Sequence, residues 1–281
     1  MPSNANSIAE AEPDTPARER VLLLIGYDGA RYSGFQQQVN APSIAGALDE
    51  AIAHVDPTAS RIIGSSRTDA GVHARMQPVT FDTQQRIRSR GWVLALTSHL
   101  PPAIAVLRAA KVPSNFDPRK RPLWKRYRYS ILRSQVEDPF SSERTWRIGQ
   151  PLDVAAMQRE AEPLVGEHDF AAFRSTHDQR TTTVRRLHEV VVREDTLDPR
   201  LLHVEVRGDR FLYNMVRIIV GSLVDVGRGR IAPGSTARAL ASRSRLDLGM
   251  TAPSAGLCLD HVELDSWGEE AWPSRLEGAP L

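Results

Sequence analysis

The residues best suited to chemistry stand in one short run, residues 64–74, which reads GSSRTDAGVHA. Its carboxylate, Asp69, follows Thr68 and stands two residues before Gly71, a setting typical of a tight turn. A carboxylate presented by such a loop can act as a nucleophile or as a general base. It can equally cap the turn, with His73 packed in the core, and the spacing alone leaves both interpretations open.

A second group with chemical potential lies in the run 124–132. Strand alternation there places Tyr127 and Tyr129 on one face and Arg126 and Arg128 on the other. Tyrosines at such positions are either ordinary core residues or rings that pack against a ligand. The alternation predicts the faces and does not decide between these two roles.

A third feature is a basic residue in a strongly apolar segment, 209–226, which we predict to be a helix. Arg210, Asn214, Arg217 and Gly221 follow a spacing that puts them on one stripe of that helix. The stripe is either an exposed basic face or a means of bringing an arginine to a buried carboxylate.

Basic residues are concentrated although the formal net charge is only +2. Residues 108–128 contain eight Lys and Arg and one acid, Asp117. Such a local excess suits either a solvated surface or a face that binds a polyanion. The predicted phosphate contacts are Arg119, Lys120, Arg121, Lys125, Arg126 and Arg128, with Arg174 and Arg180 as additions.

Composition restricts the class of protein. Cys258 is the only cysteine, which excludes an intrachain disulfide and a zinc site built from cysteines. The apolar runs are far shorter than a membrane span, so we expect no membrane association. Residues 1–19 lack the pattern of a signal peptide, and we predict a disordered leader and a cytoplasmic protein.

The hydrophobic pattern predicts the elements that position these residues. In the first half we expect strands at 21–27, 61–65, 77–81 and 104–110 and helices at 43–55 and 86–97. In the second half we expect strands at 124–132, 187–193, 201–207 and 256–264 and helices at 154–164, 209–226 and 235–242.

This order repeats a β-α-β-β-α-β-like plan, which indicates the α+β class. We predict two ferredoxin-like or RRM-like halves, with antiparallel sheets joined into one extended sheet and an active-site cleft between the halves. The expected division is a leader at 1–19, an N-terminal domain at 20–115, a C-terminal domain at 116–266 and a tail at 267–281.

The run RTDAGVHA at 67–74 resembles the signature of the tRNA pseudouridine synthase A family. Further segments resemble family motifs in the same order along the chain: YDG at 27–29, LP at 100–101, RYRY at 126–129, GEHDF at 166–170, NMVR at 214–217 and Pro253 with Gly256 and Leu257. The resemblance extends from about residue 21 to residue 264.

The resemblance implies an isomerase that needs neither cofactor nor metal. It implies that Asp69 is the catalytic carboxylate, that Arg217 pairs with it, and that Tyr127 packs on the target uracil and assists proton transfer. Arg67 corresponds to the family arginine that enters the RNA and holds the flipped base. The implied substrate is the anticodon arm of tRNA, at positions 38, 39 and 40, bound by a homodimer.

Three positions depart from the family pattern near the chemistry. Ser66 stands where a glycine is usual, Phe35 where a tryptophan is usual, and Gln37 where a basic residue is usual. These changes bear on loop conformation and on phosphate contacts, and they leave Asp69 and Arg217 in place.

Three other functions compete with this interpretation. The chain is alternatively a pseudouridine synthase for another RNA site, or a non-catalytic RNA-binding module on the same scaffold. A metal-dependent nuclease that uses Asp69 with Asp82 or His73 ranks last, because these residues lack the spacing of metal ligands.

Overall fold

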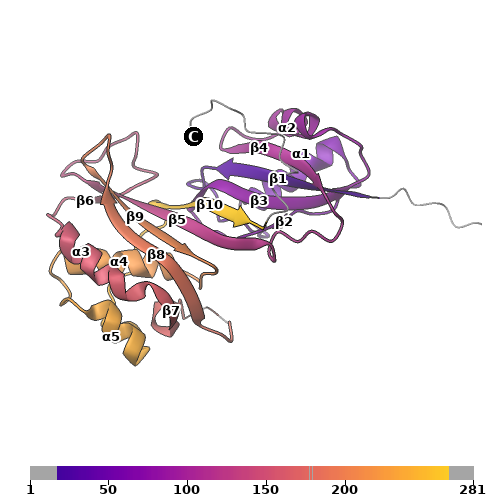
Figure 1. The fold of residues 1–281 in the computed structure, drawn as a ribbon. Helices are drawn as coiled ribbons and strands as arrows, with labels where there is room; N and C mark the ends of the chain where they lie inside the picture. The colour runs from indigo at the N-terminus through magenta and orange to yellow at the C-terminus, as the bar shows by residue number, and fades with distance from the viewer. Residues whose placement is uncertain (1–17, 177, 179, 266–281) are drawn as a thin grey trace, which may run out of the picture.

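The computed structural model describes residues 18–265 except 177 and 179. The predicted tail at 267–281 and nearly all of the predicted leader at 1–19 lie outside these residues. Figure 1 shows one long sheet that runs through two lobes, with α1 and α2 on the N-terminal lobe and α3, α4 and α5 on the C-terminal lobe. The α+β class is confirmed.

The N-terminal lobe is built from four strands and two helices. Its elements are β1 (Glu19–Tyr27), α1 (Ile44–Val55), β2 (Ile63–Gly64), β3 (His73–Thr83), α2 (Ser89–Thr97) and β4 (Ile104–Val112). Helix α1 begins where the hydroxyl of Ser43 accepts a hydrogen bond from the backbone N–H of Gly46. Its buried residues, among them Leu48 and Ile52, recur at helical spacing and face the sheet core.

The C-terminal lobe contains the remaining strands and three α-helices. Its elements are β5 (Pro122–Arg133), β6 (Trp146–Ile148), α3 (Val154–Ala161), β7 (Gly166–Asp169), β8 (Val184–Glu194), β9 (Leu201–Gly208), α4 (Met215–Gly227), α5 (Ser235–Ser242) and β10 (Leu257–Leu264). Among the described residues, no helix is long and apolar enough to cross a bilayer.

The sheet is continuous across the two lobes, in the order β4-β1-β3-β10-β5-β9-β8-β7. Most neighbours are antiparallel, but β10 lies parallel to β3, with Cys258 opposite His73. On its other edge β10 pairs antiparallel with β5, with Leu259 opposite Tyr127. The last strand of the chain therefore joins the lobes and brings the start of β3, just after Asp69, close to Tyr127.

Two strands of the structure were not predicted, and one predicted helix begins later than expected. The short strands β6 and β7 were not expected, because three or four residues are too few to show alternation. The helix predicted at 209–226 begins only at Met215, since Asn214 has a φ of 61° in the left-handed region. The predicted stripe is therefore wrong for Arg210 and Asn214, which precede the helix. The domain boundary at 115/116 stays a prediction.

Candidate active site

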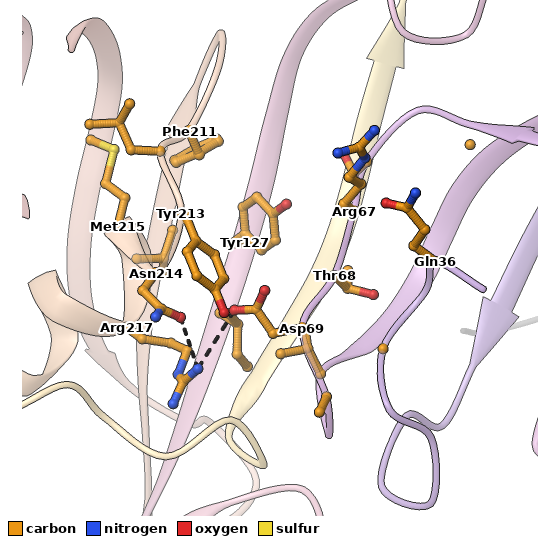
Figure 2. Close-up of a pocket in the computed structure, with 18 of the residues that line it drawn as sticks. Gln36, Arg67, Thr68, Asp69, Tyr127, Phe211, Tyr213, Asn214, Met215 and Arg217 are labelled. Atoms are coloured by element: carbon orange, nitrogen blue, oxygen red, sulfur yellow. Dashed lines mark hydrogen bonds and ion pairs between the residues drawn. The ribbon is translucent and has the colours of Figure 1, made fainter. Parts of the chain in front are cut away.

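A cleft of about 920 Å³ opens between the two lobes. Its floor and walls come from the loop 65–72 of the N-terminal lobe, from β5 and from the segment 211–217 before and at the start of α4. Figure 2 shows Arg67, Thr68 and Asp69 on one side of this cleft and Asn214 and Arg217 on the other. Neither lobe alone contains the whole site.

The loop that carries Asp69 is fixed by contacts on both of its sides. The hydroxyl of Thr68 is 2.8 Å from the buried phenol oxygen of Tyr27, and the carbonyl of Thr68 accepts a hydrogen bond from the N–H of Phe35. Gly34 has a φ of 103°, and a Cβ there would lie 2.8 Å from the Thr68 carbonyl oxygen. This close approach requires glycine and leaves Asp69 on a rigid support.

Asp69 faces Arg217 across the cleft. Arg217 Nη1 lies 3.6 Å from Asp69 Oδ2, and the two side chains are only 19% and 25% exposed. Burial raises the pKa of Asp69 above its ordinary value, and the nearby charge of Arg217 partly opposes that rise. The carboxylate is therefore poorly solvated in its charged form, a condition that increases its reactivity as a base or nucleophile.

The Arg217 guanidinium has two further partners. Nη1 donates to Asn214 Oδ1 at 2.9 Å, and Nε donates to the carbonyl oxygen of Ala252 at 2.8 Å. Dashed lines in Figure 2 mark the contacts of Arg217 with Asn214 and Asp69. The guanidinium is therefore held at two points besides Asp69.

Tyr127 lies on β5 beside this pair. It is 9% exposed, and its ring packs edge-on against Phe211 with centroids 5.0 Å apart. Burial raises the pKa of the Tyr127 phenol to about 12, a rise that a hydrogen bond with Ser66 opposes and the charge of Asp69 reinforces. The phenol stays protonated at neutral pH and lines the cleft.

Ser66 is part of the same wall. Lys125 Nζ donates to Ser66 Oγ at 2.7 Å and to the Ser65 carbonyl oxygen at 2.9 Å. Burial, with repulsion from Arg210 and Arg180, lowers the pKa of Lys125 to about 8. Lys125 thus ties β5 to the Asp69 loop and adds a positive charge to the cleft.

The other predicted substrate contacts divide into two groups. Arg67 is exposed in the cleft, where Arg119 also lies, although Arg119 pairs with Asp117 at 2.8 Å. Lys120 is exposed beside it, and Arg174 Nη1 donates to the carbonyl oxygen of Arg180 at 3.2 Å. These positions remain compatible with phosphate contacts.

Arg126 and Arg128 form the second group, on the opposite face of β5. Arg126 Nη2 lies 2.7 Å from a carboxylate oxygen of the buried Asp260, and Arg128 Nε lies 3.0 Å from Glu205 Oε1. Neither arginine lines the cleft. The alternation predicted for this strand is confirmed, with Tyr127 and Tyr129 buried, and it also separates both arginines from Tyr127.

His73 and Asp82 hold structural positions. His73 Nε2 lies 3.0 Å from the carbonyl oxygens of Glu143 and Ala255, and Asp82 forms an ion pair with Arg20 at 2.6 Å. Within the described part of the chain, no three His, Cys, Asp or Glu side chains are grouped as metal ligands. Asp82 and His73, either of which the nuclease interpretation would use with Asp69, both have other partners.

The structure adds residues to the site that the sequence did not assign to it. Phe211, Tyr213 and Asp178 line the cleft, and Asp178 accepts a hydrogen bond from the N–H of Tyr213 at 2.7 Å. These residues belong to loops, where no periodicity marks the side that faces the cleft. Lys125, by contrast, was predicted as a phosphate contact, and strand alternation places it on the face of Tyr127 in the cleft.

The chain is similar to proteins of one family over most of its length. The family model described as tRNA pseudouridine synthase matches residues 24–119 and 161–265. The tRNA pseudouridine synthase A of Geobacter sp. (strain M21) is 42% identical over 86% of this chain and 97% of its own length. The proteins of the same name from Syntrophotalea carbinolica and Halalkalibacterium halodurans are 43% and 41% identical, over 86% and 85% of this chain and 95% and 90% of their own lengths.

Proposed function

Because the chain belongs to the tRNA pseudouridine synthase A family, we propose that it converts uridine to pseudouridine at positions 38, 39 and 40 in the anticodon stem-loop of tRNA. It is an isomerase that acts on tRNA. The observation that carries the proposal at the level of the site is the meeting of Asp69, Arg217 and Tyr127 in one cleft, where cations also gather.

The reaction makes clear demands on such a site. The bond between N1 and C1′ breaks, the uracil turns within the site, and C5 forms a new bond to C1′. The proton on C5 is then lost and N1 gains one, so that product and substrate have the same composition. The enzyme must therefore supply an anionic group at the sugar or at the ring, room for the ring to turn, and a route for one proton.

We assign the anionic role to Asp69. An ionised carboxylate is required whether it attacks C1′, attacks C6 or removes the proton from C2′, and these routes remain open. Arg217, 3.6 Å away, favours the ionised form of Asp69 against the opposing effect of burial. The phenol of Tyr127 lies beside the pair, where it can pack against the uracil and assist the transfer of the C5 proton.

The uracil reaches such a cleft only when it leaves the base stack. Arg67 stands exposed beside Asp69, in a position to occupy the place of the flipped base. Lys125 adds positive charge to the cleft, which suits the phosphates that flank the target, whereas Arg119 and Arg180 lie there paired with Asp117 and Asp178. We assign the same role to Lys120 and Arg174 but not to Arg126 and Arg128, which pair with Asp260 and Glu205 away from the cleft.

We also propose that the protein works as a homodimer in the cytoplasm. Phe140 and Val136, in the loop after β5, are 94% and 72% exposed, as side chains at a contact between subunits would be in an isolated chain. Light scattering on protein eluted from a size-exclusion column would give its mass in solution, and a monomer at all concentrations would contradict the proposed homodimer.

The test of function is direct. The purified protein is incubated with unmodified total tRNA without added metal or cofactor, and pseudouridine is mapped by carbodiimide treatment and primer extension. New stops in the anticodon arm, absent with Asp69→Asn, are expected. Stops elsewhere in the tRNA would contradict the proposed positions of modification but support pseudouridine formation. Binding of tRNA without any stop would favour a non-catalytic binding module.

A further inference from the structure

Asn214 has a backbone conformation that few side chains adopt. Its φ of 61° and ψ of 5° lie in the left-handed region, immediately before the first residue of α4. The side chain of Asn214 does not cap the helix, although asparagine often does so at this position. It instead turns its Oδ1 to Arg217 Nη1, 2.9 Å away.

The same Nη1 atom is the one that approaches Asp69. The distance from Nη1 to Asp69 Oδ2 is 3.6 Å, longer than a normal hydrogen bond between these atoms. The second anchor of the guanidinium, from Nε to the Ala252 carbonyl oxygen, lies on a different segment of the chain. Asn214 therefore shares the donor that Asp69 would otherwise attract to itself.

We propose that Asn214 is a positioning residue that holds the Arg217 guanidinium beside the Asp69 carboxylate and prevents it from closing onto that carboxylate. This inference rests on the proposed function of Asp69 as the reacting carboxylate. A carboxylate bound directly by a guanidinium uses its lone pairs in that contact and becomes a weaker base and nucleophile. A carboxylate in a half-buried site with no cation nearby would be protonated more easily.

Asn214 thus sets an intermediate strength of pairing. Burial raises the pKa of Asp69, and Arg217, 3.6 Å away, opposes that rise without cancelling it. Tyr127 also faces Asp69, from β5. The other titratable and charged side chains that line the cleft are Arg67, Arg119, Lys125, Asp178, Arg180 and Tyr213.

Two substitutions change this pairing in opposite directions. Asn214→Gly removes the competing oxygen, and Asn214→Asp replaces it with a negative charge. Glycine and aspartate both tolerate a left-handed backbone, so that the start of α4 is preserved in each variant. Thermal melting of both proteins would verify that each is folded.

The measured quantity is the ionisation of Asp69 in the free, full-length protein. Carboxyl signals of protein labelled with ¹³C-aspartate are followed against pH, with Asp69→Asn to assign the signal. We expect the midpoint to fall in Asn214→Gly, because Arg217 closes onto Asp69, and to rise in Asn214→Asp, because a like charge is added. Each shift should be about one pH unit.

The acid limb of the rate of pseudouridine formation should move with these midpoints, down for Asn214→Gly and up for Asn214→Asp. Equal midpoints in all three proteins, or shifts in the same direction, would overturn the inference, because a purely structural role predicts no opposed pair of shifts. The titration needs no tRNA, so that a failure of the proposed function, seen as an inactive parent enzyme, is distinguishable from a failure of this inference.

Discussion

The pair formed by Arg217 and Asp69 allows a quantitative prediction about stability. Arg217→Met keeps most of the aliphatic stem and removes the charge, and it is made both in the natural chain and in an Asp69→Asn background. At the observed separation of 3.6 Å, the Coulomb energy of the pair is about 1 kcal/mol in water and about 5 kcal/mol at an effective dielectric constant of 20. With side chains that are 19% and 25% exposed, we expect a coupling energy of about 2 kcal/mol, between these limits.

The loss of stability caused by Arg217→Met should depend on pH in a definite direction. Because the pKa of Asp69 is raised in the folded protein, its ionised form lowers stability at neutral pH, and this cost disappears as the pH falls through the folded pKa. Removing Arg217 raises that pKa further, so Arg217→Met should be more destabilising at pH 7.5 than at pH 5. In the Asp69→Asn background the difference between the two pH values should vanish.

The assay is urea unfolding of the four proteins at both pH values, with pseudouridine formation measured on the same preparations. Losses for Arg217→Met that agree within about 0.5 kcal/mol in the natural chain and in the Asp69→Asn background would refute the pairing, since non-interacting sites add to within that margin. Full activity of Arg217→Met would remove the residue from the site, whatever its effect on stability.

Three further predictions concern two residues of the cleft and the packing of α4. Because burial raises the pKa of Tyr127 to about 12, a plot of the rate of pseudouridine formation against pH should show no change due to this phenol between pH 7 and 10. Tyr127→Phe should slow single-turnover conversion with little change in tRNA affinity, and an unchanged rate would contradict a role in proton transfer. Since the pKa of Lys125 is lowered to about 8, its charge is lost as the pH rises through 8, and filter binding should show tRNA affinity falling there in the natural protein but not in Lys125→Met. Gly221→Ala would place a Cβ 1.8 Å from the carbonyl oxygen of Met250. The melting temperature should fall by an amount equivalent to about 1–3 kcal/mol of stability, and an unchanged melting temperature would be inconsistent with this packing.

Local patterns predicted the parts of the site that lie on regular elements. Alternation along β5 placed Tyr127 and Tyr129 on the buried face, because a strand has a period of two whatever its neighbours are. The apolar spacing of Ile44 to Val55 likewise predicted α1 to within a residue. In both cases the burial pattern was already present in a window of about ten residues.

Contacts between distant segments could not be predicted in this way. No pattern in residues 257–264 shows that β10 lies between β3 and β5, since strand pairing depends on partners far away in the sequence. The start of α4 was also predicted too early, because the apolar spacing continues through Leu212 while the left-handed backbone at Asn214 interrupts the helix. That interruption is what turns the Asn214 side chain toward Arg217.

The positions of the basic residues in the run 108–128 show why a count of charges does not define an RNA-binding surface. Lys125 and Arg126 are adjacent in the sequence, yet β5 sends them to opposite faces. Arg126 is neutralised by the buried Asp260, which holds β5 against β10, whereas the described contacts of Lys125 within 3 Å are a hydroxyl and a carbonyl oxygen. A cation already paired with a buried carboxylate has little to gain from a phosphate, while one crowded by Arg210 and Arg180 is relieved by it. The affinity for RNA should therefore follow the unpaired cations of the cleft rather than the total positive charge of the segment.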